Sequence, residues 1–141
     1  MSTIFITGVS SGIGEALAYV YARKKYTIGI CARRIDTLNK IADTCKELGG
    51  KMYVYKLDVQ NQEQCNSIAR DFLESTSGID YVIANAGIGG DDGLYSGSGE
   101  IINKILKTNI MGVTNTVMPF IPKMKEQKHL IKSSVLLQIS S

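Results

Sequence analysis

The chain has 141 residues, of which 44% are hydrophobic and 21% are charged, a composition typical of one ordinary globular domain. The formal net charge is only +3, and the 16 Lys and Arg residues are scattered without a long basic run. This pattern argues against a nucleic-acid-binding arm or a membrane-binding patch, so neither kind of partner is expected.

Short apolar runs bounded by polar residues or glycine predict strands over 4–6, 27–31, 52–57, 81–84 and 135–139. Apolar residues at helical spacing predict helices over 14–25, 35–48, 61–75, 100–107 and 112–127, the last with a kink or break at Pro119 and Pro122. The glycine-rich stretch 87–99 is expected to be a loop. Alternating strands and helices predict an α/β fold with a parallel sheet, in one domain over residues 1–141.

A glycine turn follows the first strand and opens the first helix, with the sequence Thr7-Gly8-Val9-Ser10-Ser11-Gly12-Ile13-Gly14. This context is typical of a phosphate-binding turn, because a helix N-terminus offers free amides and partial positive charge. Gly8 would allow the tight turn, Gly12 the approach of a diphosphate, and Gly14 the close packing of helix on strand. Ser10 and Ser11 can add hydroxyl donors. The alternative is a small-residue turn without a ligand.

The end of the second strand, Cys31-Ala32-Arg33-Arg34, bears on the choice of coenzyme. A carboxylate at this position would bind the ribose 2′-hydroxyl of NAD(H), whereas guanidinium groups suit a 2′-phosphate. Arg33 and Arg34 therefore favour NADP(H) over NAD(H). The alternative is that both arginines simply open the next helix in solvent or pair with Asp36.

The cysteines and the N-terminus indicate a cytoplasmic protein. Cys31, Cys45 and Cys65 are widely spaced and form no Cys-x-x-Cys motif, so buried thiols are expected, with neither a metal site nor a disulfide framework. The N-terminus reaches glycine too early for a signal peptide, and no apolar run approaches the length of a membrane span.

Four further motifs follow the glycine turn in order. They are Leu57-Asp58-Val59, Ala84-Asn85-Ala86-Gly87, Lys107-Thr108-Asn109-Ile110-Met111-Gly112 and Gln138-Ile139-Ser140-Ser141. Together with Thr7-Gly8-x3-Gly12-Ile13-Gly14, they resemble the classical short-chain dehydrogenase/reductase family over essentially the whole chain, with Ala84 replacing the first Asn of that family's Asn-Asn-Ala-Gly motif.

The resemblance implies a Rossmann-type doubly wound parallel sheet, of which about five strands fall within this chain. It implies that Gly8, Ser10, Ser11, Gly12, Ile13, Gly14, Arg33, Arg34, Asp58, Val59, Asn85, Ala86 and Gly87 bind the coenzyme, and that Asn109 and Ser141 belong to the catalytic set. Other roles stay open for three of these residues. Asp58 could cap the helix near Asn61, Asn109 could mark a helix boundary, and the Asn85 amide could tie neighbouring strands together.

The resemblance also implies hydride transfer between a nicotinamide and a small carbonyl or alcohol substrate, with a Tyr-x-x-x-Lys pair about a dozen residues past the serine. Ser141 is the last residue here, and the pair Tyr21 and Lys25 lies near the far end of the first helix, remote from any nicotinamide. We therefore expect a chain that is incomplete relative to the family, inactive alone, and homo-oligomeric at full length. The alternative is a non-catalytic dinucleotide-binding or sensor module.

Overall fold

The computed structural model describes residues 2–87, 99–127 and 133–135, with side chains described up to Gln127. Five parallel strands form one sheet in the order β3-β2-β1-β4-β5. Their bounds are Thr3–Thr7 for β1, Thr27–Ala32 for β2, Lys51–Lys56 for β3, Tyr81–Ala84 for β4 and Ser133–Val135 for β5. The order reverses between β1 and β4, which is the doubly wound pattern of a Rossmann-type fold.

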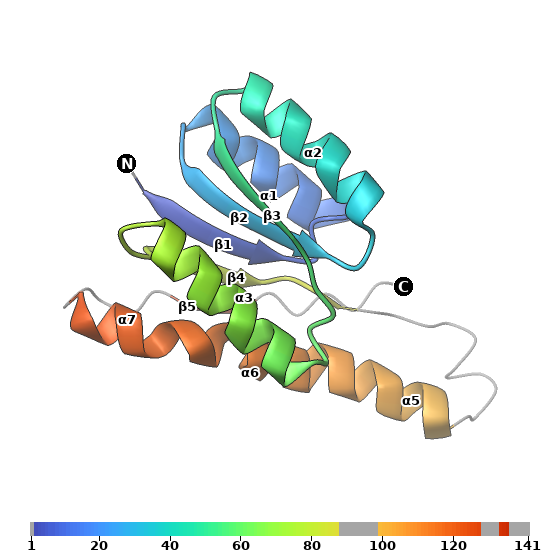
Figure 1. Cartoon of the computed structure of the whole chain (residues 1–141). Coiled ribbons are helices and arrows are strands. Elements are labelled where there is room, and N and C mark those ends of the chain that lie inside the picture. Colours follow the sequence, from blue (N-terminus) through green and yellow to red (C-terminus); the bar gives the residue numbers. More distant parts are fainter. Residues whose placement is uncertain (1, 88–98, 128–132, 136–141) are drawn as a thin grey trace.

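Helices cover both faces of this sheet (Figure 1). On one face lie α1 (Gly12–Arg23) and α2 (Ile35–Glu47), and on the other lie α3 (Gln62–Ser75), α6 (Gly112–Val117) and α7 (Ile121–Glu126). The helix α5 (Gly99–Leu106) precedes α6 and extends past the carboxyl end of the strands. Among the described residues, no helix is long and apolar enough to cross a membrane.

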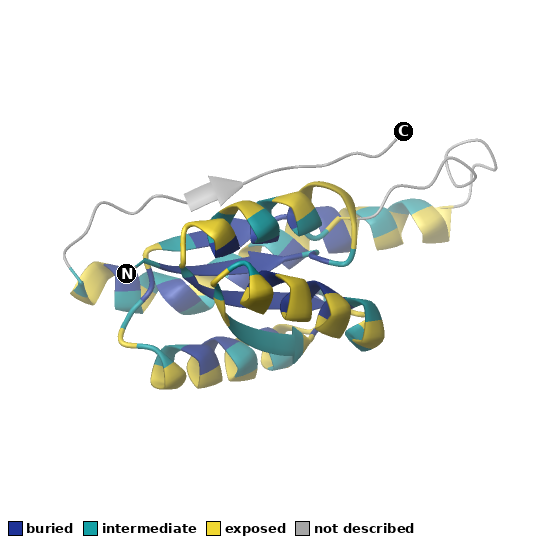
Figure 2. Ribbon diagram, turned by 90° about the horizontal axis from the view of Figure 1, so that it is seen from above, coloured by how far each residue is buried: buried dark blue, intermediate teal, exposed yellow. Residues whose placement is uncertain are grey.

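The inner strands are buried on both faces, as the helices on either side require. Every residue of β1 and β2 is buried, and Figure 2 shows the burial concentrated along the middle of the molecule. Ile4 and Ile6 pack in the core beneath α1 and α2, whereas Phe5 points to the opposite core. There the Phe5 ring lies 5.3 Å from that of Phe72 and 4.9 Å from that of Phe120.

The predicted fold class is confirmed, and the corrections concern element boundaries. The last strand covers Ser133–Val135 and not 135–139, and residues 136–141 lie outside the described part. The first helix ends at Arg23, and Lys25 has a φ of 60°, so Tyr21 and Lys25 do not share one helical face. This turn is required because the chain must reverse direction within three residues to start β2 at Thr27.

The predicted break at the two prolines is confirmed, and a second irregularity lies before it. Pro119 is in a 3-10 turn over Met118–Phe120, and Pro122 is in the first turn of α7, where a missing N–H costs no helical hydrogen bond. A π-helical turn over Lys107–Met111 joins α5 to α6. The sequence pattern predicts two separate helices here, over 100–107 and 112–127. Such turns insert an extra residue into a helix and are frequent at functional sites.

Candidate functional site

The glycine turn holds β1, the start of α1 and the end of β4 in close contact. Gly8 has a φ of 71°, and a Cβ there would lie 2.6 Å from the Cα of Ala86. A Cβ on Gly14, in the first turn of α1, would overlap the carbonyl of Gly8 and come within 2.6 Å of the Asn85 side-chain nitrogen. Side chains at these two positions would therefore push the helix away from the sheet.

Asn85 and Thr7 fasten the end of β4 to this turn. The Thr7 hydroxyl accepts hydrogen bonds from the backbone N–H groups of Asn85, at 3.0 Å, and Ala86, at 3.1 Å. The Asn85 side-chain nitrogen donates to the carbonyl of Gly8 at 3.1 Å. The amide of Asn85 thus ties neighbouring strands together. Its oxygen, Oδ1, is buried without a hydrogen-bond partner in the described part of the chain.

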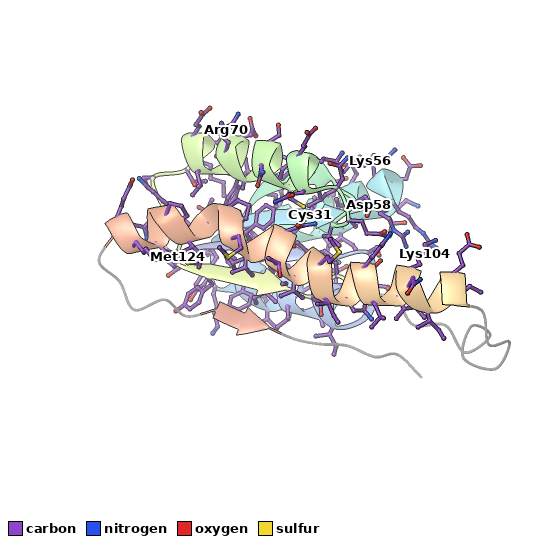
Figure 3. All side chains as sticks on the ribbon, turned by 90° about the horizontal axis from the view of Figure 1, so that it is seen from below. Cys31, Lys56, Asp58, Arg70, Lys104 and Met124 are labelled. Carbon is purple, nitrogen blue, oxygen red and sulfur yellow. The ribbon has the colours of Figure 1, made fainter. Side chains whose placement is uncertain are left out.

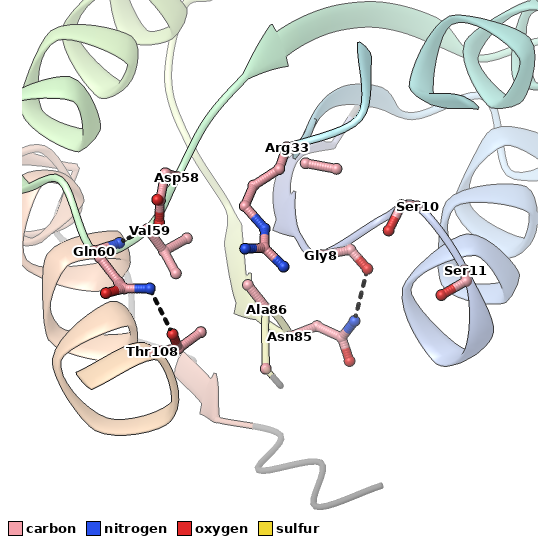
Figure 4. A pocket seen from close by; sticks show the side chains of 12 residues that line it. Gly8, Ser10, Ser11, Arg33, Asp58, Val59, Gln60, Asn85, Ala86 and Thr108 are labelled. Carbon is pink, nitrogen blue, oxygen red and sulfur yellow. Dashed lines mark hydrogen bonds between the residues drawn. The ribbon is translucent and has the colours of Figure 1, made fainter. Parts of the chain in front are cut away.

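A cavity of about 130 Å³ opens at the carboxyl ends of the strands (Figure 4). It is lined by the end of β2, by the segments that follow β1, β2, β3 and β4, and by the π-helical turn. The lining residues are Gly8, Ser10, Ser11, Ala32, Arg33, Asp58, Val59, Gln60, Asn85, Ala86, Gly87 and Thr108. The cavity therefore lies at the reversal of strand order between β1 and β4, where open α/β sheets bind their ligands.

The two adjacent arginines take different positions. Arg33 lines the cavity, and its guanidinium group lies between Asp58 and Gly8 (Figure 4). Arg34 is the N-cap residue of α2 and does not line the cavity. Within the described part of the chain, the ion pairs are Lys46–Asp43 and Lys123–Glu126, so neither arginine has a carboxylate partner there. Among the described residues that line the cavity, Arg33 is therefore a cation free to bind an anionic ligand.

Asp58 shapes the loop that faces Arg33. Its carboxylate oxygen Oδ1 accepts from the backbone N–H of Gln60 at 3.0 Å, and its own N–H donates to the Gln64 side chain at 3.0 Å. The cap of α3 is Asn61, which accepts from the backbone N–H of Gln64 at 3.0 Å, so Asp58 does not fill that role. The Asp58 carboxylate lines the cavity and keeps Oδ2 as an acceptor for a ligand.

The sequence-predicted residues are only partly brought together. Gly12, Ile13 and Gly14 form the first turn of α1 behind the cavity and do not line it. Asn109 is buried in the π-helical turn, one residue after the lining residue Thr108, and Ser141 lies outside the described residues. Asn109 therefore lies in the π-helical turn that joins α5 to α6.

Gln60 and Thr108 were missed by sequence reasoning. The Gln60 side-chain nitrogen donates to the Thr108 hydroxyl at 2.8 Å, which joins the loop after β3 to the π-helical turn. Asn115 supports the same loop, because its side-chain nitrogen donates to the carbonyl of Val59 at 2.9 Å. The sequence could have indicated these two residues only through their positions next to predicted site residues. Gln60 follows Asp58-Val59, and Thr108 precedes Asn109.

The donors and acceptors of this cavity fit a nicotinamide dinucleotide. The N-cap residue Ser11 makes no side-chain capping hydrogen bond, so the amides at the start of α1 can bind a diphosphate. Arg33 offers a guanidinium group, and Asp58 offers an acceptor for an exocyclic amino group. The unpartnered Asn85 Oδ1 is an acceptor suited to a ribose hydroxyl.

Residues 2–141 match the profile of the short chain dehydrogenase family. This chain belongs to that family. An uncharacterized oxidoreductase from Listeria innocua is 34% identical over 133 residues, which are 93% of this chain and 54% of the relative. The 11-beta-hydroxysteroid dehydrogenase-like 3 protein of Arabidopsis thaliana is 34% identical over 89% of this chain and 41% of its own length. This short-chain dehydrogenase sequence thus spans about half the length of the curated relatives it matches.

Solved structures of short-chain dehydrogenases share the fold. An alcohol dehydrogenase from Thermococcus sibiricus, complexed with 5-hydroxy-NADP, is 34% identical and superposes with a TM-score of 0.86 over 96% of this chain and 57% of that one. A short chain dehydrogenase/reductase from Burkholderia phymatum, in complex with NAD, is 26% identical, with a TM-score of 0.87 over 95% of this chain and 48% of that one. Similar proteins therefore bind either NADP or NAD, and this chain belongs to an oxidoreductase family.

Proposed function

We propose that this chain is the NADP(H)-binding part of a short-chain oxidoreductase that transfers a hydride between the coenzyme and a small carbonyl or alcohol substrate. The observation that carries the preference for NADP(H) is Arg33, an unpaired cation in the cavity at the tip of β2. No carboxylate lines the cavity from this strand, whereas binding of an unphosphorylated ribose would use one there. The Thermococcus sibiricus structure, with its NADP derivative, supports the same assignment.

Each part of the cavity takes a separate part of the coenzyme. The turn from Gly8 to Ser11 and the amides at the start of α1 hold the diphosphate, with Ser10 and Ser11 as additional donors. Asp58 and Val59 hold the adenine, and Asn85 and Ala86 hold the ribose on the nicotinamide side. The nicotinamide, when bound, supplies the hydride donor or acceptor.

We further propose that these 141 residues alone bind coenzyme without catalysing its reaction. Asn109 and Ser141 are the members of the catalytic set that the resemblance assigns within this sequence. Tyr21, at the far end of α1, packs its ring 5.2 Å from that of Tyr26, away from the cavity. No Tyr–Lys pair within the described residues lines the cavity, so the general acid of the proposed reaction would come from a segment outside those residues. If a longer protein lacks such a pair too, a coenzyme-binding sensor module is the second candidate.

A homo-oligomer is proposed for the full-length protein. Ile110 and Met111 in the π-helical turn, and Met118 at the start of the 3-10 turn after α6, are 54–59% exposed. Large apolar side chains left this exposed favour a protein contact. Light scattering on the full-length protein should give a mass above one chain, and a monomer at micromolar concentration would contradict the proposal.

Fluorescence titration with NADPH and NADH tests the coenzyme assignment. We expect NADPH to bind at least about tenfold more tightly than NADH, since a charge-assisted contact to phosphate contributes about 1.5–3 kcal/mol. The Arg33→Ala variant should weaken NADPH binding about tenfold and leave NADH binding nearly unchanged. Arg34→Ala is the matched control and should have a smaller effect, because Arg34 does not line the cavity. Equal affinities of the unmodified chain for the two coenzymes would overturn the NADP(H) assignment.

A further inference from the structure

A second, more open cavity of about 560 Å³ adjoins the coenzyme cavity. It is lined by Gln60, Glu100, Asn103, Lys104 and Lys107. Gln60 also lines the coenzyme cavity, so its side chain lies at the boundary between the two. Figure 3 shows Asp58 of the first cavity and Lys104 of the second at the same end of the molecule, opposite the end where Arg70 and Met124 lie.

Hydrogen bonds from both the backbone and the side chain hold Gln60 in this position. Its backbone N–H donates to Asp58 at 3.0 Å, and its side-chain nitrogen donates to the Thr108 hydroxyl at 2.8 Å. Thr108 is itself 6% exposed, so it is a fixed partner and not a mobile surface group. This bond holds the glutamine side chain between the loop after β3 and the π-helical turn (Figure 4). Because Gln60 lines both cavities, a side chain held there can act as a partition between them.

The second cavity carries a positive charge. Lys104 and Lys107 contribute two cations and Glu100 one anion, and none of them belongs to the ion pairs found in the described part of the chain. Unpaired lysines beside an opening favour an anionic group over a cationic one, although exposure to solvent keeps this preference modest.

We propose that Gln60 is a specificity-determining residue that closes the adenine end of the coenzyme cavity against substituents on the exocyclic amino group. Without the Gln60 side chain, such a substituent would pass into the second cavity, and an acidic one would be preferred there. The inference rests on the proposed function, which places the adenine amino group at the Asp58 carboxylate, two residues from Gln60.

Isothermal titration calorimetry with three probes tests this proposal: NADP⁺, N6-carboxymethyl-NADP⁺ and N6-(2-aminoethyl)-NADP⁺. Calorimetry is suitable because the chain has no tryptophan to report the binding of an oxidised coenzyme. The unmodified chain should bind both substituted probes at least about tenfold more weakly than NADP⁺. Gln60→Ala should reduce this discrimination, measured as the ratio of probe affinity to NADP⁺ affinity in the same variant, about tenfold for the carboxymethyl probe.

Two further variants distinguish loss of the Gln60 partition from a general disturbance of the loop after β3. Thr108→Val removes the hydroxyl that holds Gln60 and should reduce the discrimination by about threefold. Gln62→Ala is the matched control, because Gln62 is an exposed glutamine at the start of α3 that lines neither cavity, and it should bind all probes like the unmodified chain. In Gln60→Ala, the carboxymethyl probe should bind about threefold more tightly than the aminoethyl probe at low salt, and this difference should disappear at high salt.

Failure of the Gln60 proposal and failure of the proposed coenzyme function give different results. If the unmodified chain binds none of the three probes, the proposed coenzyme function fails. If NADP⁺ binds but Gln60→Ala and Thr108→Val discriminate as strongly as the unmodified chain, Gln60 is not the partition and the inference is overturned. A Gln60→Ala variant that binds both substituted probes equally at low salt would overturn the preference for an acidic substituent.

Discussion

Thr7 and Asn85 join β1 and β4 at their carboxyl ends, because the Thr7 hydroxyl accepts the backbone N–H of Asn85 at 3.0 Å. The same oxygen accepts the N–H of Ala86 at 3.1 Å, and the Thr7 side chain is fully buried. A single hydroxyl thus satisfies two amides at the point where β4 leaves the sheet and the coenzyme cavity begins.

Thr7→Val should destabilise the chain by about 2–4 kcal/mol, since each buried N–H left without a partner costs about 1–3 kcal/mol. The substitution preserves the shape of the side chain, so the loss reports the hydrogen bonds and not a cavity. Urea unfolding followed by circular dichroism measures it. Thr7→Ser retains the hydroxyl and should lose distinctly less stability; similar losses for both variants would assign the effect to the methyl group instead.

Gly14→Ala should destabilise the chain by about 3 kcal/mol and weaken coenzyme binding, because the new methyl group would overlap the backbone of Gly8. Gly99→Ala is the matched control. A Cβ on Gly99, at the start of α5, meets no atom within 4 Å. Its stability should be unchanged or raised by up to about 1 kcal/mol. Thermal unfolding of the two variants side by side gives the comparison, and equal melting temperatures would contradict the close packing of α1.

The cysteines should resist thiol reagents in the folded chain. Burial raises the pKa of Cys45 and of Cys65 to about 11, and it raises the pKa of Cys31 well above its ordinary value. The thiolate is the reactive form, and a raised pKa keeps these thiols protonated. Labelling of the native protein with a disulfide reagent at about pH 8 should therefore be slow. Unfolding in guanidinium should release all three thiols. Rapid labelling of any cysteine without denaturant would contradict its burial.

Tyr19 should make the chain less stable at alkaline pH. Burial, together with the hydrogen bond that its hydroxyl donates to Glu15 at 2.8 Å, raises the pKa of Tyr19 to about 12 from an ordinary value of 10.0. The folded state thus holds a proton that the unfolded state releases at lower pH. Its contribution to stability is complete below pH 10 and is lost as the pH rises through 12. Urea unfolding between these values should show a smaller loss for Tyr19→Phe than for the unmodified chain.

The glycine turn could be predicted from sequence because its requirements are local. Gly8 needs a positive φ, and the backbone amides of α1 follow from the helix itself, so neither depends on distant residues. The two arginines show the limit of such reasoning. Arg33 and Arg34 are the same residue type at adjacent positions, yet Arg33 lines the cavity and Arg34 is the N-cap residue of α2. The reason is that consecutive residues at a strand end point in different directions.

Features that depend on contacts between distant segments could not be predicted. The Gln60–Thr108 hydrogen bond joins residues 48 positions apart, and neither residue belongs to a pattern that signals the other. The π-helical turn has the same origin. It is followed directly by Gly112, where a Cβ would lie 2.6 Å from a methyl group of Val59, so tertiary packing against the loop after β3 accompanies this irregular turn.

The position of β1 in the sheet has a consequence for the order of folding. β1 is the central strand, and one of its neighbours, β4, begins far along the chain; the bond from Thr3 to Asp80 spans 77 residues. Pairing with β2 closes a short loop, whereas pairing with β4 must close a long one before its hydrogen bonds contribute. Refolding should therefore form the β1–β2–β3 half of the sheet first, with the cavity between β1 and β4 assembled in the slowest step.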